Sequence, residues 1–401
     1  MDRKGQLWVL QTLMGMVGFD VQHPGSQSFA EALGYNHADM LKIIEQMKTG
    51  AMSTKYLTMV AGENETRAMN AEERGYQLSA SELYQRAAYL YLRAQYTYFR
   101  DDPRKTALHT KGVGCYQKVM QLSPTPIERV EIPFEGKKVY AILHLPAKSG
   151  KVPCVLLVPG MDMVKEEWHV IAKRYYVSRG VAVMAIDGPG QGETLLHGLK
   201  VTIDNYEKAA SAVVDYLVER PEIDSEKIAA MGVSMGSYWG SRIASHEPRL
   251  KACATGLGCY GPKDVLFNIA QPSYKINFMF MSGIESEAEF DEKFTNGMSL
   301  VDLIPKIKCP YLMSVGEFDE LDPLERGLMM YESAPCPKEL WVWENEFHPL
   351  GGVASEFFSL ASEWILEKLG GRYDPNMDDR FYIDKDGKWH RGNGWPLWWI
   401  M

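Results

Sequence analysis

Residues 232–236 read Gly-Val-Ser-Met-Gly, a G-x-S-x-G motif directly after the apolar run at residues 228–231. A serine in this setting lies on a tight turn between a strand and a helix, which lifts its hydroxyl clear of the backbone. Glycines flank such a serine because the turn strains the main chain and leaves no room for a Cβ atom. The motif predicts that Ser234 is a nucleophile, a hypothesis that its context must support.

A serine nucleophile needs a base, usually histidine, and a carboxylate that orients the base. Asp319 follows a predicted strand at residues 311–315, and His348 follows the next predicted strand, near residues 340–342. This is the chain order serine, acid, histidine of the α/β-hydrolases. Three other acidic residues share the loop and could orient the base, namely Glu317, Glu320 and Asp322. The distance of Asp319 from the end of the strand favours it.

The oxyanion that forms during such a reaction needs backbone N–H donors held in place beforehand. One donor is predicted to be the N–H of Met235, directly after the nucleophile. The other is predicted to be the N–H of Met161, in the loop at residues 159–162 that follows a predicted strand. The alternative for this loop is a plain turn between a strand and a helix.

The composition excludes several classes of protein. With 46% hydrophobic and 24% charged residues, the chain can bury a sizeable core. A net charge of −9 without a basic stripe or zinc-finger spacing argues against a nucleic-acid partner. Six cysteines without C-x-x-C spacing favour free thiols in a reducing compartment. The apolar stretch at residues 7–17 resembles neither a signal peptide nor a membrane span, so we expect a cytoplasmic protein without a membrane partner.

The first part of the chain has helical periodicity. Residues 81–99 carry apolar side chains at the spacing of a helix face, and an Asp-Asp-Pro sequence ends this helix. A second helix is predicted over residues 103–122, and residues 30–52 predict at least one more. The Ser-Pro-Thr-Pro sequence at residues 123–126 then indicates a linker.

After the linker, short apolar runs alternate with helical stretches, which predicts a mostly parallel sheet covered by helices on both faces. Two antiparallel strands come first, at residues 127–134 and 138–145. The further strands are predicted at residues 154–158, 181–186, 228–233, 252–255, 311–315 and 340–342. Since ligand sites form beyond the carboxyl ends of parallel strands, Ser234, Asp319 and His348 should meet at one edge of the sheet.

Residues 187–193 read Asp-Gly-Pro-Gly-Gln-Gly-Glu and are superficially similar to a phosphate-binding loop. They lack both the G-K-[ST] ending and the G-x-G-x-x-G spacing, so they predict a structural turn. The histidines form no metal-ligand pattern such as H-E-x-x-H, and we expect neither a metal nor another cofactor. Cys259 is placed to approach the site, but a buried thiol without a chemical role is the simpler interpretation.

Three segments together resemble a known family: Pro-Gly-Met-Asp at residues 159–162 with Lys-Glu-Glu at residues 165–167, the run at residues 187–193, and the Ser234 motif. They resemble the α/β-hydrolases grouped around 2,6-dihydroxypseudooxynicotine hydrolase. This group includes the fermentation-respiration switch esterase and the fungal polyketide-shortening hydrolases. The resemblance covers about residues 80–365.

The resemblance implies an α/β-hydrolase fold with an N-terminal helical cap domain over the active site, and a triad of Ser234, Asp319 and His348. The expected units are a cap domain at residues 1–123, a catalytic domain at residues 124–370, and a C-terminal tail at residues 371–401. This aromatic-rich tail should pack on the body or on a partner subunit.

The sequence departs from the family at residues 159–163, where the commoner form is Gly-Gly-Leu-Asp-Ser. The pocket beside the oxyanion hole is therefore not inferred from the family. The nicotine-pathway enzyme also uses a further carboxylate, and no motif assigns that role to Asp264 here.

Three functions follow from these residues and from the resemblance. The first is a serine hydrolase that cleaves a carbon–carbon bond next to a ketone in an aromatic or polyketide-like molecule. The second is a carboxylesterase or lactonase acting on a similar apolar substrate. The third is a non-catalytic binding protein on the same fold. The expected partners are a small-molecule substrate and further copies of the chain, in a homo-oligomer that we expect to be a dimer.

Overall fold

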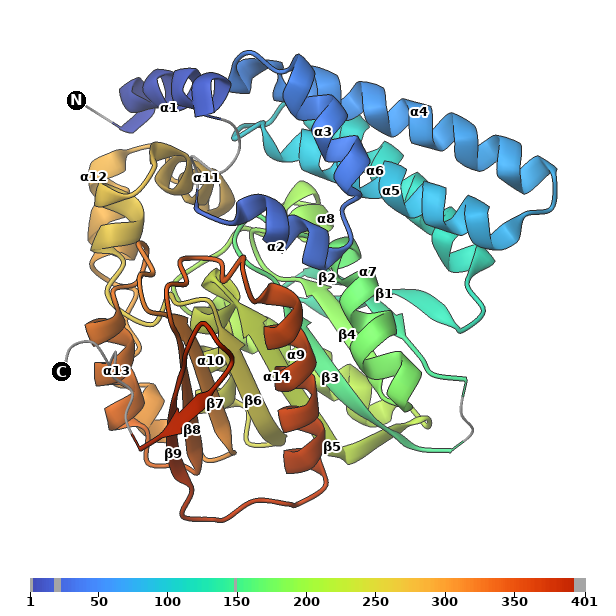
Figure 1. The fold of residues 1–401 in the computed structure, drawn as a ribbon. Helices are drawn as coiled ribbons and strands as arrows, with labels where there is room; N and C mark the ends of the chain where they lie inside the picture. The colour runs from blue at the N-terminus through green and yellow to red at the C-terminus, as the bar shows by residue number, and fades with distance from the viewer. Residues whose placement is uncertain (1–2, 18–22, 148–149, 393–401) are drawn as a thin grey trace.

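A ten-stranded sheet forms the centre of the computed structural model, which describes residues 3–17, 23–147 and 150–392. Its strand order is β1-β2-β4-β3-β5-β6-β7-β8-β9-β10 (Figure 1). The strands from β4 across to β9 are parallel to one another. The pairs β1–β2, β2–β4 and β9–β10 are antiparallel. The prediction of a mostly parallel sheet that begins with an antiparallel pair is confirmed.

The first eight strands correspond to the predicted ones, and the last two were not predicted. The strands are β1 (Ile127–Phe134), β2 (Lys137–His144), β3 (Val152–Val158), β4 (Ala182–Asp187), β5 (Ile223–Val233), β6 (Leu250–Gly256), β7 (Tyr311–Gly316), β8 (Lys338–Trp343), β9 (Asp378–Ile383) and β10 (Trp389–Arg391). The described part of the predicted tail thus extends the sheet beyond β8. Residues 393–401 lie outside the described residues.

Fourteen α-helices occur in the described residues. They are α1 (Arg3–Val17), α2 (Ser26–Leu33), α3 (His37–Gln46), α4 (Ser53–Glu73), α5 (Gln77–Tyr96), α6 (Pro103–Leu122), α7 (His169–Ile171), α8 (Gly192–Leu196), α9 (Asn205–Glu219), α10 (Met235–His246), α11 (Pro272–Ser282), α12 (Glu287–Phe290), α13 (Leu324–Ser333) and α14 (Ala354–Leu369). None of these described helices is long and apolar enough to cross a membrane.

Side chains alternate between the two faces of the sheet, as the two-residue period of a strand requires. On β3, Leu156 belongs to the apolar cluster that includes Val213 of α9 and Trp239 of α10. Its neighbour Leu157 belongs to a second cluster, which includes Phe357 of α14. Because helices cover both faces, the central strands are apolar throughout rather than alternating.

The helices α1 and α3–α6 form a layer along one end of the sheet, and α2 lies between this layer and the sheet (Figure 1). Local capping sets where α6 starts. Asp102 accepts a hydrogen bond from the N–H of Arg104, and Pro103 occupies the first turn of α6. Tyr89 of α5 and Leu157 of β3 belong to the same apolar cluster, so the helical layer packs directly on the rest of the protein.

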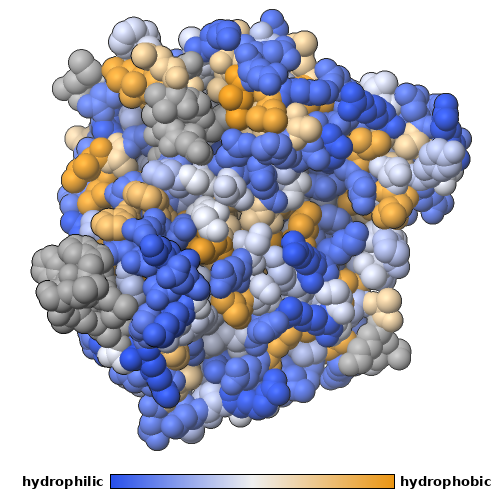
Figure 2. Space-filling model, in the orientation of Figure 1, coloured by the Kyte–Doolittle hydropathy of each residue, from blue (hydrophilic) through white to orange (hydrophobic). Residues whose placement is uncertain are grey.

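The outer surface of the helical layer carries apolar side chains. Figure 2 shows a mostly polar face on which apolar side chains gather in the upper part, over α1 and the neighbouring helices. On α1, Trp8 is 72% exposed and Met16 is 78% exposed. Leu10 and Met14 on the same helix are buried, so α1 is apolar on more than its inner face.

Candidate active site

Ser234 lies between β5 and α10 in a strained backbone conformation, with φ 56° and ψ −125°. The flanking glycines make this turn possible. A Cβ atom on Gly232 would lie 2.0 Å from the carbonyl oxygen of Gly236, and one on Gly236 would lie 2.3 Å from that of Val158. Both distances are far inside van der Waals contact, so the motif requires glycine at the two positions. The turn has the features of a nucleophile-bearing strand-to-helix turn.

The three residues predicted to meet at the sheet edge do meet there. Ser234 Oγ lies 2.8 Å from His348 Nε2, and His348 Nδ1 lies 3.1 Å from Asp319 Oδ2. Ser234 follows β5, Asp319 follows β7 and His348 follows β8. Since these strands are parallel, their carboxyl ends bring the three side chains to one edge. The arrangement lets His348 accept the serine proton while Asp319 holds the other ring nitrogen.

The loop after β7 contains four carboxylates, and only Asp319 among them hydrogen-bonds the ring of His348 in the described residues. The remaining Asp319 oxygen, Oδ1, accepts the N–H groups of Leu321 and Asp322, each at 2.9 Å. The other three carboxylates accept hydrogen bonds elsewhere: Glu317 from the Asn345 backbone, Glu320 from the His348 backbone, and Asp322 from the Tyr260 and Gly261 backbones.

His348 is buried, and opposing influences act on its pKa. Burial is the largest influence and lowers the pKa. The negative charge of Asp319 and its hydrogen bond act in the opposite direction, with Glu320 and Asp322 adding to them. The net result is a pKa above the ordinary value of 6.5. A histidine in this environment is a stronger base than a free imidazole.

The loop predicted to supply one oxyanion donor passes beside Ser234. A Cβ atom on Gly160 would lie 3.4 Å from the Cβ of Ser234. Gln191 Nε2 donates to the carbonyl oxygen of Gly160 at 2.7 Å, and Tyr206 donates to Gln191 Oε1 at 2.7 Å. The loop is therefore fixed from behind. Met161 lies in it, whereas Met235 is the first residue of α10; their roles as N–H donors remain predictions.

The glycine-rich run at residues 187–193 is a structural turn, as predicted. Asp187 accepts the backbone N–H groups of Lys165 and Glu193, both at 2.8 Å. The ammonium of Lys165 pairs with the carboxylate of Asp187 at 2.9 Å and with that of Glu193 at 3.0 Å. A Cβ atom on Gly192 would lie 2.2 Å from Asp187 Oδ2. Sequence reasoning missed one role of this run, which is the support that Gln191 gives to the loop beside Ser234.

A cavity of about 240 Å³ opens next to Ser234 and His348. Its walls combine the sheet edge with the helical layer. The apolar lining includes Leu7, Leu10, Met14, Leu33, Met40 and Leu57, and the polar lining includes His23, Arg93, Tyr96, Gln271 and Tyr274. Cys259 is buried and also lines the cavity. Asp264 is not among the lining residues and pairs with Arg326 at 2.7 Å, so the geometry gives it no role in this site.

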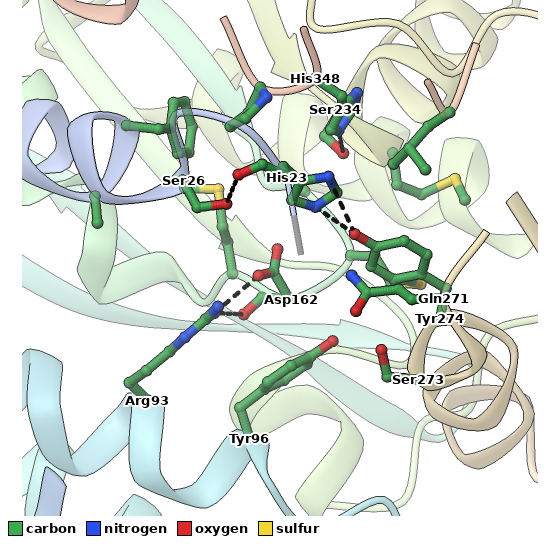
Figure 3. A pocket seen from close by; sticks show the side chains of 18 of the residues that line it. His23, Ser26, Arg93, Tyr96, Asp162, Ser234, Gln271, Ser273, Tyr274 and His348 are labelled. Atoms are coloured by element: carbon green, nitrogen blue, oxygen red, sulfur yellow. Dashed lines mark hydrogen bonds and ion pairs between the residues drawn. The ribbon is translucent and has the colours of Figure 1, made fainter. Parts of the chain in front are cut away.

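Two polar contacts tie the helical layer to the loops around the site. Arg93 of α5 donates to Asp162 Oδ2 at 2.8 Å (Figure 3). Tyr35 donates to Glu167 Oε1 at 2.5 Å. Burial raises the pKa of Glu167 to about 7, although Arg93 and the hydrogen bond from Tyr35 act to lower it. Asp162 and Glu167 belong to segments that carry the family resemblance, but nothing in the sequence predicted their partners Arg93 and Tyr35.

A second histidine from the N-terminal part of the chain stands beside the first. The ring centroids of His23 and His348 are 5.2 Å apart. His23 Nδ1 lies 2.8 Å from Glu320 Oε1, and its ring stacks on Tyr274. Because His23 follows no predicted strand and belongs to no motif, no local signal indicated its position.

Comparisons with known proteins find hydrolases among the similar chains. A model of the family described as FrsA-like esterases matches residues 36–290. The 2,6-dihydropseudooxynicotine hydrolase of Paenarthrobacter nicotinovorans is 29% identical over 367 residues, which cover 91% of this chain and 94% of that protein. The 20-hydroxy-prefusarin hydrolase of Gibberella moniliformis is 36% identical over 204 residues, covering 48% of this chain and 47% of that protein.

The solved structures include a similar fold along nearly the whole chain. The crystal structure of 2,6-dihydroxy-pseudo-oxynicotine hydrolase matches with a TM-score of 0.78 and 27% sequence identity. The match covers 88% of this chain and 98% of that one. The similarity therefore includes the helical layer as well as the sheet.

Proposed function

The chain belongs to the FrsA-like esterase family, and we propose that it is a serine hydrolase that cleaves a carbon–carbon bond next to a ketone. The observation that carries the proposal is the hydrogen-bonded chain from Ser234 through His348 to Asp319, at a cavity lined largely by apolar side chains. Support for the ketone comes from the relative that matches 91% of the chain and is named as a pseudooxynicotine hydrolase.

The proposed reaction begins when His348 Nε2 takes the proton of Ser234 Oγ, which attacks the ketone carbon. Asp319 keeps the Nδ1 hydrogen of the ring in place and stabilises the imidazolium. The negative oxygen rests on the N–H groups of Met235 and Met161. The carbon–carbon bond then breaks, and its electron pair leaves with the departing carbon. His348 returns the proton to that carbon, and water releases the acyl group from Ser234.

The departing carbanion limits the substrate. A carbon leaves with an electron pair only if a neighbouring group delocalises the charge, as the second carbonyl of a β-diketone or the ring of an acylated phenol does. The apolar lining of the cavity supports an aromatic or polyketide-like compound of this kind. Hydrolysis of a carboxylic ester or lactone is the second candidate, because the matching family model is one of esterases.

We further propose that residues 1–123 act as the cap domain of the catalytic domain at residues 124–370, with residues 371–401 as its tail. Support for a cap comes from α1 and α5, which line the cavity.

A cytoplasmic location is supported by the six cysteines, all of which are free. A dimer is supported by the exposed Trp8 and Met16 of α1, and sedimentation equilibrium would test it.

The test of the function uses 1-phenylbutane-1,3-dione, a β-diketone with an aromatic ring, and follows its cleavage to a carboxylic acid and a ketone. Ser234→Ala should lower turnover by about 10⁶-fold, the loss seen when a serine nucleophile is removed. Ser178→Ala, an exposed serine on another part of the chain, should leave turnover unchanged. A loss of less than about tenfold in Ser234→Ala would contradict the proposal.

A further inference from the structure

A second hydrogen-bonded chain lies beside the first one. The hydroxyl of Tyr274 hydrogen-bonds Nε2 of His23, and Nδ1 of His23 hydrogen-bonds Glu320 Oε1 at 2.8 Å. Figure 3 shows His23 between Tyr274 and the pair of Ser234 and His348. Its order of hydroxyl, imidazole and carboxylate is the same as in the chain from Ser234 to Asp319, but its hydroxyl belongs to a tyrosine.

The directions of these hydrogen bonds follow from Glu320. A carboxylate only accepts, and the other oxygen of Glu320 already accepts the backbone N–H of His348 at 3.1 Å. The hydrogen of the His23 ring therefore sits on Nδ1 and points to Glu320. Burial lowers the pKa of His23, and this effect is larger than the raising effect of Glu320. The ring is therefore neutral near pH 7. Nε2 then accepts, and Tyr274 donates to it.

This arrangement makes the Tyr274 hydroxyl a hydrogen-bond acceptor, rather than a donor, for a ligand in the cavity. A tyrosine hydroxyl has one hydrogen, and in Tyr274 that hydrogen is directed to His23. The oxygen can then only accept, and it already accepts one hydrogen bond from the side chain of Gln271, which leaves one lone pair for a ligand in the cavity. The neighbouring side chain of Gln271 adds a second acceptor, because its Oε1 atom is buried and has no hydrogen-bond partner among the described residues. Both residues line the cavity.

A buried acceptor without a partner costs free energy unless a ligand supplies a donor. We propose that Tyr274 Oη and Gln271 Oε1 form an acceptor pair that binds an O–H group of the substrate close to its reacting carbonyl. The enzyme would then select enolic or phenolic ketones over their O-methyl ethers. This inference rests on the proposed function, since it concerns the substrate of the same site.

The chemistry of the leaving group and this polarity agree. A β-diketone in its enol form and an acylated phenol both carry an O–H close to a ketone, whereas their methyl ethers carry none. The ring of His23, which hydrogen-bonds Tyr274, stands 5.2 Å from that of His348. Tyr274 and Gln271 line the same cavity as Ser234. Sites that hydrogen-bond a substrate hydroxyl can reject an analogue without it by about 10⁴-fold or more.

The test compares 1-phenylbutane-1,3-dione with its enol methyl ether by calorimetric binding to the Ser234→Ala protein, in which no cleavage occurs. The enol form should bind at least about 100-fold more tightly than the ether. Adding Tyr274→Phe should reduce this ratio by at least about tenfold, because the substrate O–H loses its acceptor.

His23→Phe tests whether the direction of the Tyr274 hydrogen matters, because the hydroxyl itself is retained. This variant keeps an aromatic ring beside Tyr274 but frees the hydrogen of the tyrosine. Tyr274 can then donate to an ether oxygen, so the ether should bind more tightly and the ratio should fall. Tyr84→Phe is the matched control, because it removes a tyrosine hydroxyl bonded to Glu72 at 2.7 Å outside the cavity. It should leave the ratio unchanged.

Three results would overturn the inference: equal binding of the enol and the ether, no binding of the enol, or an unchanged ratio in Tyr274→Phe. A purely structural role of Tyr274 is tested with the same two ligands. A structural defect would weaken binding of the enol and the ether alike, and such a result in Tyr274→Phe would also overturn the inference. Failure of the proposed function is distinguishable, because it would appear as a loss of turnover below about tenfold in Ser234→Ala whatever Tyr274 does.

Discussion

The two histidines at the cavity come from regions that are built in different ways. His348 lies in a loop at the carboxyl end of β8, and parallel strands carry its partners Ser234 and Asp319 to the same edge. His23 comes from the N-terminal part of the chain and meets Tyr274 across 251 residues of sequence. The strand topology positions the proposed triad, whereas packing of the N-terminal part of the chain places His23 in the wall of the cavity.

The first prediction concerns the carboxylate of Asp319 at the sheet edge. Asp319→Asn removes the charge that orients His348 and should lower turnover by about 10⁴-fold. Glu320 should not replace it, because its two oxygens bind His23 and the backbone of His348. Asp264→Asn, an acidic residue outside the cavity, should change turnover less than twofold, an approximate limit for surface changes of this kind. A loss in Asp264→Asn as large as in Asp319→Asn would contradict the assignment.

The second prediction concerns a contact between the helical layer and the loop beside Ser234. Arg93→Met removes the hydrogen bond that holds Asp162, directly after Met161 in the loop beside Ser234. Turnover should fall by about 10- to 100-fold, the effect of a small misplacement of reacting groups. Lys118→Met is the control, since its ion pair with Glu72 joins two helices away from the cavity. Equal kinetics for the two variants would show that the loop does not depend on Arg93.

The third prediction compares the two regions through glycine. Gly232→Ala places a Cβ atom against backbone in the turn at Ser234 and should lower the free energy of unfolding by about 2–3 kcal/mol. In α6, a Cβ atom on Gly114 would meet nothing within 4 Å. Gly114→Ala should therefore raise the free energy of unfolding by about 0.5–1 kcal/mol. Urea titrations measure both, and a stable Gly232→Ala protein would argue against the tight turn.

The fourth and smallest effect is on pH dependence. His348 acts as a base only when unprotonated, so kcat/KM should rise with pH through its pKa, which lies above the ordinary value of 6.5. Glu320 contributes to that increase, and Glu320→Gln should move the inflection to lower pH. An inflection that stays in place or moves upward in this variant would contradict the electrostatic account.

The strands and the sheet-edge residues could be predicted because their signals are local. β3 to β8 contain short apolar runs, β1 and β2 flank a Glu-Gly turn, and α6 has a proline in its first turn. The loops after β7 and β8 then narrowed the search for an acid and a base to a few side chains. Asp319 and His348 lie where these local signals placed them.

The parts that were missed depend on packing rather than on local sequence. α4 buries small or polar residues such as Ala61, Asn64 and Ala68, so its apolar face is weak in the sequence. β9 and β10 lie in the predicted tail, whose aromatic residues indicated an ordered segment but no strands. The acceptor pair of Tyr274 and Gln271 could not be predicted, because its polarity depends on a histidine from the other end of the chain.

The proposed mechanism requires Ser234 to carry the acyl group during cleavage. Acyl transfer to Ser234 can be detected by rapid quenching of the wild-type protein during turnover of 1-phenylbutane-1,3-dione, followed by peptide mass spectrometry. We expect an acetyl or benzoyl group on the Ser234 side chain. Product formation without any acyl group on Ser234 would rule out this mechanism.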